Sequence, residues 1–248
     1  MVYLDIIVDN LPGLLASLLA CFLCFVAGRI WENRKRLKLY GLTCLKRNEN
    51  VRISAAYLFR VVVDGKYLLI RGKRITTQYQ PVGGVYQYYE SARGTLDGLA
   101  FQPDDSMKSN SSDPNDLRIV VPRKNVIPFL DWFDKGIGRE ICVIREFREE
   151  LVEPGYVSKA ALDAFSPELI RHCDRKLGYS KHFKMSEMLV HDVYEVRLSQ
   201  EEQKRIVEYA SKHPGGELIL VGRGEIERET FEQDGSYFTI APTAGETL

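Results

Sequence analysis

The chain lacks an excess of either charge. Its 248 residues hold 34 lysines and arginines against 34 aspartates and glutamates. Because binding to duplex nucleic acid uses a basic surface, this balance excludes a protein that works by bulk attraction to DNA or RNA. Hydrophobic residues make up 45% of the chain and charged residues 27%, which excludes a disordered or collagen-like chain. The composition predicts a globular protein that forms no stable complex with a nucleic-acid duplex.

Cysteine is scarce and follows no pattern. The cysteines show neither the spacing of a disulfide framework nor that of a metal site; they are Cys21, Cys24, Cys44, Cys142 and Cys173. The first two lie in the apolar run described next, where a thiol simply packs. This usage is typical of a chain whose main part faces a reducing cytoplasm.

Long uncharged stretches are scarce as well, and one lies near the start. No side chain between Asn10 and Gly28 carries a charge, and most are leucine, alanine, phenylalanine or valine. A bilayer core of about 30 Å needs about 20 helical residues. The run therefore predicts a single transmembrane helix over residues 10–31, after a short tail of residues 1–9, with Trp31 at the headgroup level.

The charges that flank this run predict its orientation. Asp5 and Asp9 precede it, whereas basic residues follow it: Arg29, Arg34, Lys35, Arg36 and Lys38. Since cytoplasmic flanks carry the positive excess, we expect a single-pass protein of the cell inner membrane with a cytoplasmic C-terminal domain. Residues 32–52 form a basic juxtamembrane linker, either lying on lipid headgroups or solvated. A cleaved signal peptide, which normally starts with a basic segment, and a buried or interfacial helix are the alternatives.

Residues 53–248 read as one α/β domain of the α+β kind, with an insertion at about residues 88–137. Asp64-Gly65 joins two β-rich stretches, residues 55–63 and 66–71, and predicts a hairpin. Asp, Ser, Asn and Pro dominate residues 102–116, which predicts a mobile loop. Further strands are expected at residues 75–82, 117–121, 188–198, 217–221 and 237–240, and helices at 139–151 and 201–212. Strands at both ends of the domain favour a mixed sheet.

The helix expected at residues 139–151 carries the most chemistry. At about 100° per residue its apolar residues share one face, while Glu146, Glu149 and Glu150 share the other. Like charges at this spacing repel, and Mg²⁺ or Mn²⁺ would relieve the repulsion and hold a pyrophosphate. Arg145 is spaced to brace Glu149. The alternative is an ordinary solvated face whose glutamates are neutralised by neighbouring arginines.

Glycines and candidate ligand contacts precede this helix. Gly83-Gly84 follows a predicted strand, where the missing side chains allow a backbone carbonyl to approach a metal or a phosphate. Arg71 lies upstream and could reach a substrate phosphate, although nothing in the sequence selects it over Arg60 and Arg74. Tyr86 lies just downstream, in a tyrosine-rich stretch that either stacks a base or packs as an ordinary strand.

Residues 145–150, Arg-Glu-Phe-Arg-Glu-Glu, resemble the helix of the Nudix hydrolase signature. The resemblance implies a mixed sheet between helices, with Glu146, Glu149 and Glu150 as ligands of Mg²⁺ or Mn²⁺ and as catalytic groups. It implies that Arg145 orients a glutamate and that a carbonyl of Gly83 or Gly84 joins the metal shell. Two departures stand out. A long insertion separates the glycines from the helix, and Ile137 replaces an upstream glutamate, for which Glu140 is the nearest substitute.

A narrower resemblance is to the SMODS-associated Nudix domains of CBASS antiphage systems. It rests on residues 80–84, Gln-Pro-Val-Gly-Gly, on the insertion, on the acidic helix and on residues 238–242. It implies a membrane-anchored effector that hydrolyses a nucleoside-diphosphate-linked substrate. The alternative is a catalytically silent, membrane-tethered nucleotide sensor that signals through clustering of its transmembrane helices. The partners implied are a nucleotide, the lipid bilayer, a cyclic-nucleotide signal and further copies of the chain.

Overall fold

The computed structural model describes residues 2–73, 75–104, 113–233 and 235–248, with side chains from residue 17 onward. The chain divides into two compact units, Met1–Arg47 and Asn48–Leu248. The domain expected at residues 53–248 therefore begins a few residues earlier, because Asn50 already belongs to a strand.

The first unit consists of two helices, α1 (Val2–Glu32) and α2 (Arg34–Cys44). The expected tail and apolar run lie in α1, and α2 occupies much of the expected linker. Large apolar side chains of α1 are exposed: Leu18, Leu19, Phe22, Leu23, Phe25, Ile30 and Trp31. The predicted transmembrane helix is not confirmed: across the described part of the chain, no helix combines the length and the apolar character that crossing a bilayer requires. Side chains at residues 10–16 of the predicted span lie outside that part.

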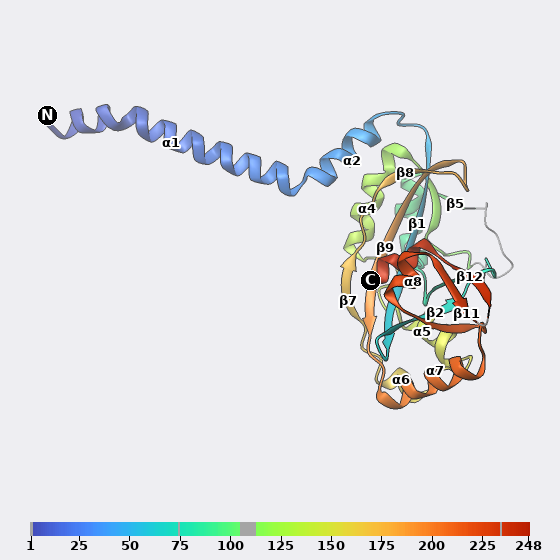
Figure 1. The fold of residues 1–248 in the computed structure, drawn as a ribbon. Helices are drawn as coiled ribbons and strands as arrows, with labels where there is room; N and C mark the ends of the chain where they lie inside the picture. The colour runs from blue at the N-terminus through green and yellow to red at the C-terminus, as the bar shows by residue number, and fades with distance from the viewer. Residues whose placement is uncertain (1, 74, 105–112, 234) are drawn as a thin grey trace. The chain divides into compact units, whose positions relative to one another are not determined.

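The second unit is built around one long strand, β1 (Asn50–Val63) (Figure 1). β9 (Met185–Val196) runs parallel along one edge of β1. β6 (Arg118–Pro122) and β4 (Gly83–Val85) pair with its other edge in the antiparallel sense. A strand in the middle of a covered sheet is buried on both faces, and β1 is accordingly buried along most of its length. The predicted mixed sheet is confirmed.

The predicted hairpin is also confirmed. β1 turns through Asp64 and Gly65, with φ of 49° and 75°, into β2 (Lys66–Arg71). Positive φ at both turn positions matches the right-handed twist of the two strands, and Asp-Gly tolerates it. The sheet continues from β2 to β10 and β3, and from β3 to β12 and β11; their bounds are Leu218–Val221, Gln78–Pro81, Ser236–Ile240 and Thr230–Gln233.

The predicted insertion is part of the core. It contributes β6, which pairs with β1, and α4 (Val126–Lys135), whose Phe133 packs against Tyr86 with ring centroids 5.3 Å apart. Its other elements in the described residues are η1, α3, β5 and η3, at Glu90–Ala92, Arg93–Gly98, Gln102–Pro103 and Arg123–Asn125. Most of the predicted mobile loop, residues 105–112, lies outside the described residues, and its first two residues form β5.

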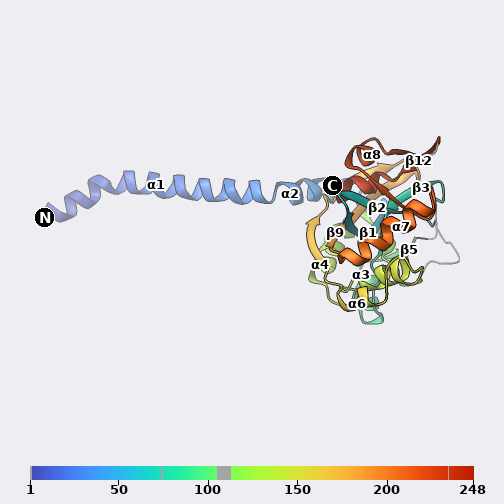
Figure 2. The same cartoon turned by 60° about the horizontal axis from the view of Figure 1, so that its bottom comes forward.

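Further helices and strands belong to the same unit. α7 (Gln200–Lys212) packs against β10 and β1 (Figure 2). Its first turn is capped by Ser199, whose hydroxyl accepts from the Glu202 amide at 3.3 Å. The others are α6, β7, β8, α8 and η5, at Ala160–Asp163, Glu168–His172, Leu177–Ser180, Arg223–Glu227 and Pro242–Thr247.

Candidate active site

The acidic helix is shorter than predicted. α5 (Ile144–Phe147) begins five residues after Arg139 and continues directly into a π-helical turn, η4 (Arg148–Val152). Upstream of α5, the Glu140 amide instead donates to the Gln87 carbonyl at 2.7 Å, and the Arg139 guanidinium lies 3.8 Å from the Phe133 ring centroid. The prediction of helix from residue 139 was wrong because backbone pairing with a distant segment competes with the helix.

The π-helical turn shapes the acidic side of the site. Its wider hydrogen bond joins the Glu153 amide to the Arg148 carbonyl at 2.8 Å. Turns of this kind occur often at functional sites. Phe147 and Leu151 are fully buried, and Glu150 is buried beside them. The turn thus anchors itself in the core and carries a carboxylate inward with it.

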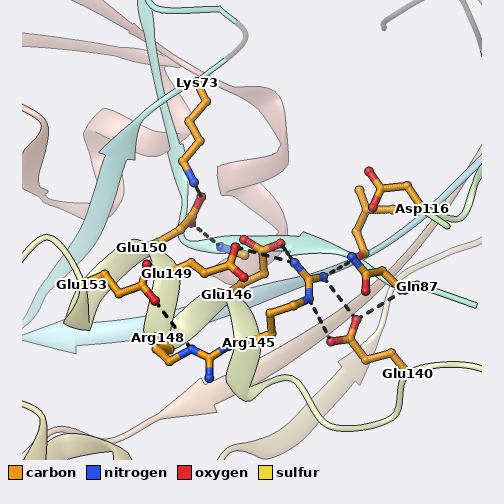
Figure 3. A network of polar contacts seen from close by, with 12 residues as sticks. Lys73, Gln87, Asp116, Glu140, Arg145, Glu146, Arg148, Glu149, Glu150 and Glu153 are labelled. Carbon is orange, nitrogen blue, oxygen red and sulfur yellow. Dashed lines mark hydrogen bonds and ion pairs between the residues drawn. The ribbon is translucent and has the colours of Figure 1, made fainter. Parts of the chain in front are cut away.

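The glycine pair and the acidic turn meet in one cavity of about 470 Å³, which we call the acidic cavity. The insertion does not keep them apart, because β4 pairs with β1 and α5 packs against β4. The cavity is lined by Lys73, Gln80, Gly83, Gly84, Val85, Gln87, Asp113, Asp116, Arg118, Arg145, Glu146, Glu149 and Glu150. Figure 3 shows the polar contacts among its charged residues. All predicted metal-ligating residues are therefore present together with both glycines.

At the glycine pair, β4 lies close to two neighbours, the Glu146 side chain of α5 and the backbone of β1. A Cβ atom at Gly84 would lie 2.2 Å from the Glu146 side chain, and one at Gly83 would lie 2.2 Å from the Tyr57 carbonyl oxygen. The Gly83 amide donates to Glu150 Oε2 at 3.1 Å. The backbone of β4 therefore contacts the carboxylates directly, through an amide in this structure.

Arg145 is held between two carboxylates. Its Nη1 lies 2.6 Å from Glu146 Oε1, its Nε lies 3.2 Å from Glu140 Oε1, and its Nη2 donates to the Val85 carbonyl at 2.9 Å. The contact expected with Glu149 is longer, at 3.8 Å. Arg145 thus orients a glutamate as expected, with Glu146 rather than Glu149 as its closest partner.

Glu140 supplies Arg145 with a buried carboxylate that Ile137 cannot supply. It is buried, it pairs with Arg145, and its Oε2 accepts from the Gln87 amide at 3.3 Å. Ile137 is 72% exposed. The substitute that the sequence indicated only by its proximity is therefore the glutamate that fixes Arg145 from the side opposite Glu146.

Lys73 was missed by sequence reasoning, which chose Arg71 from the same basic stretch. Its Nζ lies 3.3 Å from Glu150 Oε1; the Lys73 side chain is 64% exposed and the Glu150 side chain only 4%. Lys73 therefore lies at the rim of the acidic cavity, and its ammonium group faces a buried carboxylate. Only the fold brings residues 73 and 150 together, so no local signal could have identified the pair.

Burial alters the acidity of two of the glutamates. It raises the pKa of Glu150 to about 7, with the charge of Glu146 adding to the rise while Lys73 and the Gly83 amide oppose it. Burial also raises the pKa of Glu146, against the opposing charge of Arg145. A carboxyl that titrates near neutral pH can both hold and release a proton under ordinary conditions.

The donor chemistry of the acidic cavity fits a hard divalent cation. Its acidic ligands are carboxylate oxygens, which Mg²⁺ and Mn²⁺ prefer. Glu150 is buried and Glu146 is half-buried, and both have raised pKa values, so nearby negative charge is costly and a cation would offset it. In the described residues, however, no group of three or more acidic, histidine or cysteine side chains is gathered to hold a metal. Arg145 and Lys73 pair with these carboxylates instead.

Two predicted ligand contacts lie elsewhere. Arg71 donates to the Tyr79 hydroxyl at 2.8 Å and to the carbonyls of Gly215 and Gly216, so it fixes a loop and does not line the acidic cavity. Tyr86 is fully buried, and its hydroxyl donates to Asp192 Oδ2 at 2.8 Å. A stacking role for Tyr86 does not fit this position, because the ring has no exposed surface.

One comparison with known proteins gave a result. The family model described as SMODS-associated NUDIX domain matches residues 50–248, which is nearly the whole second unit and includes every residue of the acidic cavity. A search of curated proteins and a search of solved structures each gave no match.

Proposed function

The chain belongs to the SMODS-associated NUDIX domain family, and from this premise we propose that it hydrolyses a phosphoanhydride bond in a nucleoside-diphosphate-linked substrate. The family supports the predicted enzyme class, a Nudix-type hydrolase. The observation that carries the proposal is the acidic cavity, in which the Gly83–Val85 strand and the glutamates of α5 and η4 meet across the insertion.

The glutamates have separate roles in this proposal. Glu146, Glu149 and Glu150 would hold Mg²⁺ or Mn²⁺, which when bound supplies charge neutralisation and lowers the pKa of water. Glu149 is the most accessible of the three, with a side chain that is 37% exposed, and it meets Arg145 at 3.8 Å. We assign proton acceptance from the attacking water to Glu149, because the other two are held by shorter contacts.

Two basic side chains of the acidic cavity, Arg145 and Lys73, hold its glutamates in place. Arg145 keeps Glu146 oriented through the 2.6 Å contact and is itself fixed by Glu140. Lys73 reaches in from the rim to Glu150. A ligand phosphate entering the cavity would offer Lys73 a second anionic partner, which suits a flexible ammonium group better than a fixed guanidinium.

A turnover assay tests the proposal. The full chain is incubated with Mg²⁺ or Mn²⁺ and a panel of dinucleotides, nucleoside diphosphates and cyclic oligonucleotides. We expect hydrolysis that falls about 100-fold or more in Glu149→Gln, because the lost carboxylate is both ligand and base. Glu153→Gln is the matched control, since Glu153 lies just beyond the same turn, pairs with Arg148 at 3.7 Å and does not line the acidic cavity. Equal turnover in the two variants, or none in the unaltered chain, would contradict the proposal.

A catalytically silent nucleotide sensor is the second candidate. It is favoured by the pairing of the carboxylates with Arg145 and Lys73 in place of a gathered metal site. In this case the same panel gives binding without turnover, and Glu149→Gln leaves the affinity unchanged.

Whether the chain is a hydrolase or a sensor, we propose a role in CBASS antiphage defence, with a cyclic nucleotide as the signal.

The cell inner membrane is our proposed location. The support is the set of large apolar side chains exposed on α1, followed by the basic α2. We propose that α1 embeds in the bilayer, leaves the second unit in the cytoplasm and allows copies of the chain to cluster. Fractionation tests this: the chain should sediment with membranes and resist an alkaline wash, whereas recovery in the soluble fraction would contradict it.

A further inference from the structure

A second cavity lies beside the acidic one, and we propose that it binds the heterocyclic base of the nucleotide whose phosphates occupy the acidic cavity. Its volume is about 410 Å³, and we call it the base cavity. This inference rests on the proposed function, since it names the part of the substrate that lies beyond the phosphates.

The two cavities share a wall. Gln80, Gly83, Gly84, Val85 and Arg118 line both of them. The two cavities therefore adjoin along β4, and the proposed ligand has its base in one and its phosphates in the other.

The walls of the base cavity differ from those of the acidic cavity. Apolar side chains line much of it, among them Ala56, Leu58, Val85, Leu189, Phe183 and Pro242. Polar side chains are also present, among them Gln78, His182 and Thr243. Apolar walls with a few hydrogen-bonding groups suit a flat heterocycle better than a phosphate or a sugar alone.

The positive charge within the base cavity is already paired. Arg52 is buried; its Nε lies 2.6 Å from Asp104 Oδ2 and its Nη1 lies 2.5 Å from Glu187 Oε1. The Arg52 guanidinium carbon lies 3.9 Å from the Phe183 ring centroid. Arg52 thus fixes the Phe183 ring through cation–π contact, and it is placed as a support for that ring and not as a phosphate ligand.

One of the two histidines that line this cavity is paired as well. His191 is buried, and its Nδ1 lies 2.6 Å from Glu246 Oε2. With Arg52 and His191 both engaged by carboxylates, and with Arg118 paired to Asp116 at 2.9 Å, the base cavity offers an anion little uncompensated positive charge. The phosphates of a bound nucleotide are therefore directed across β4 to the acidic cavity, where a divalent cation would hold them.

Binding measurements on the full chain test the assignment. The probes are inorganic pyrophosphate and the four common ribonucleoside diphosphates, each with Mg²⁺, titrated by calorimetry. We expect at least one nucleoside diphosphate to bind about tenfold or more tightly than pyrophosphate, because base stacking adds affinity of that order. Phe183→Ala should remove this preference and leave the pyrophosphate affinity unchanged. Thr243→Trp, which fills the cavity from η5, should do the same without removing the ring.

Tyr179→Ala is the matched control. Tyr179 is an exposed aromatic residue on β8, close to Phe183 in sequence, and it lines neither cavity. It should keep the preference. Equal affinity of the unaltered chain for pyrophosphate and every nucleoside diphosphate would overturn the inference, as would a preference that survives both cavity variants. A preference lost in those variants in a chain without hydrolytic activity would support the base cavity and contradict only the proposed hydrolysis.

Discussion

The acidic cavity and the apolar core around β2 and β3 differ in how well the hydrogen bonds and charges of their buried polar groups are satisfied. In the core, the Tyr79 hydroxyl donates to the Gly216 carbonyl at 2.6 Å and accepts from Arg71 at 2.8 Å, amid apolar side chains. In the cavity, burial raises the pKa of Glu146 and Glu150, so their charge is held at a cost. A core satisfies its polar groups for stability, whereas a site keeps groups that a ligand can satisfy better.

The largest expected effect is on the core side of this comparison. Leu69 is 1% exposed and packs in the core with Tyr79, Ile219 and Ile240. Leu69→Ala should lower the free energy of unfolding by about 3 kcal/mol, because it removes buried methyl groups and leaves a cavity. Urea denaturation measures this. Metal-dependent binding at temperatures where the variant stays folded should be unchanged, and a loss of such binding would show that the two regions are not separable.

Removing the central cation should come next. Arg145→Ala leaves Glu140 and Glu146 without the guanidinium that lies between them, and both are largely buried. We expect a loss of about 2 kcal/mol in the free energy of unfolding, reduced from the cost of a fully buried pair because the Arg145 side chain is 22% exposed. Arg148→Ala is the control, since its ion pair with Glu153 is exposed and should contribute under about 0.5 kcal/mol. Similar losses in both variants would contradict the special role of Arg145.

The third substitution, Glu150→Gln, should stabilise the fold, whereas the first two destabilise it. The Glu150 carboxyl titrates at its ordinary value of 4.5 when unfolded and at about 7 when folded. Its contribution to stability is therefore fully present below about pH 4.5 and is lost as the pH rises through about 7. In the presence of a chelator, Glu150→Gln should be more stable than the unaltered chain by on the order of 2 kcal/mol at pH 8, with a smaller difference at pH 5.

Thermal or urea denaturation across this pH range measures the difference, with Glu153→Gln as the control. A Glu150→Gln variant that is destabilised at pH 8 would show that the Lys73 and Gly83 contacts outweigh the cost of burial.

Metal addition should give the smallest effect. At a concentration near ten times its dissociation constant, Mg²⁺ should stabilise the unaltered chain by about 1.4 kcal/mol, since it binds only the folded state. The gain should vanish in Glu150→Gln and persist in Glu153→Gln. Stabilisation of equal size in all three chains would show that the cation binds outside the acidic cavity.

Features that depend on neighbouring residues were predictable from the sequence, whereas features that depend on pairing between distant segments were mostly not. The turn at Asp64-Gly65 was predictable because the conformation of two adjacent residues decides it. The start of the acidic helix was not, because the Glu140 amide bonds to the distant Gln87 carbonyl. The meeting of residues 145–150 with Gly83 followed from motif resemblance, whereas the Lys73–Glu150 pair depends on how the chain segments are brought together in three dimensions.

The position of Tyr86 illustrates the same limit. A tyrosine-rich strand suggested a stacking surface, yet α4 from the insertion covers Tyr86 with Phe133. Sequence period alone does not show which face of an internal strand a later helix will cover, so a buried ring and a ligand-facing ring look alike until the fold is known.

Manganese titration followed by electron paramagnetic resonance tests the central claim most directly, because it reports the bound cation itself. We expect a single Mn²⁺ site that Mg²⁺ displaces, that is lost in Glu150→Gln and Glu149→Gln, and that remains in Glu153→Gln. Undiminished Mn²⁺ binding in both cavity variants, or no bound Mn²⁺ in the unaltered chain with or without nucleotide, would contradict the assignment of the acidic cavity as a metal-dependent site.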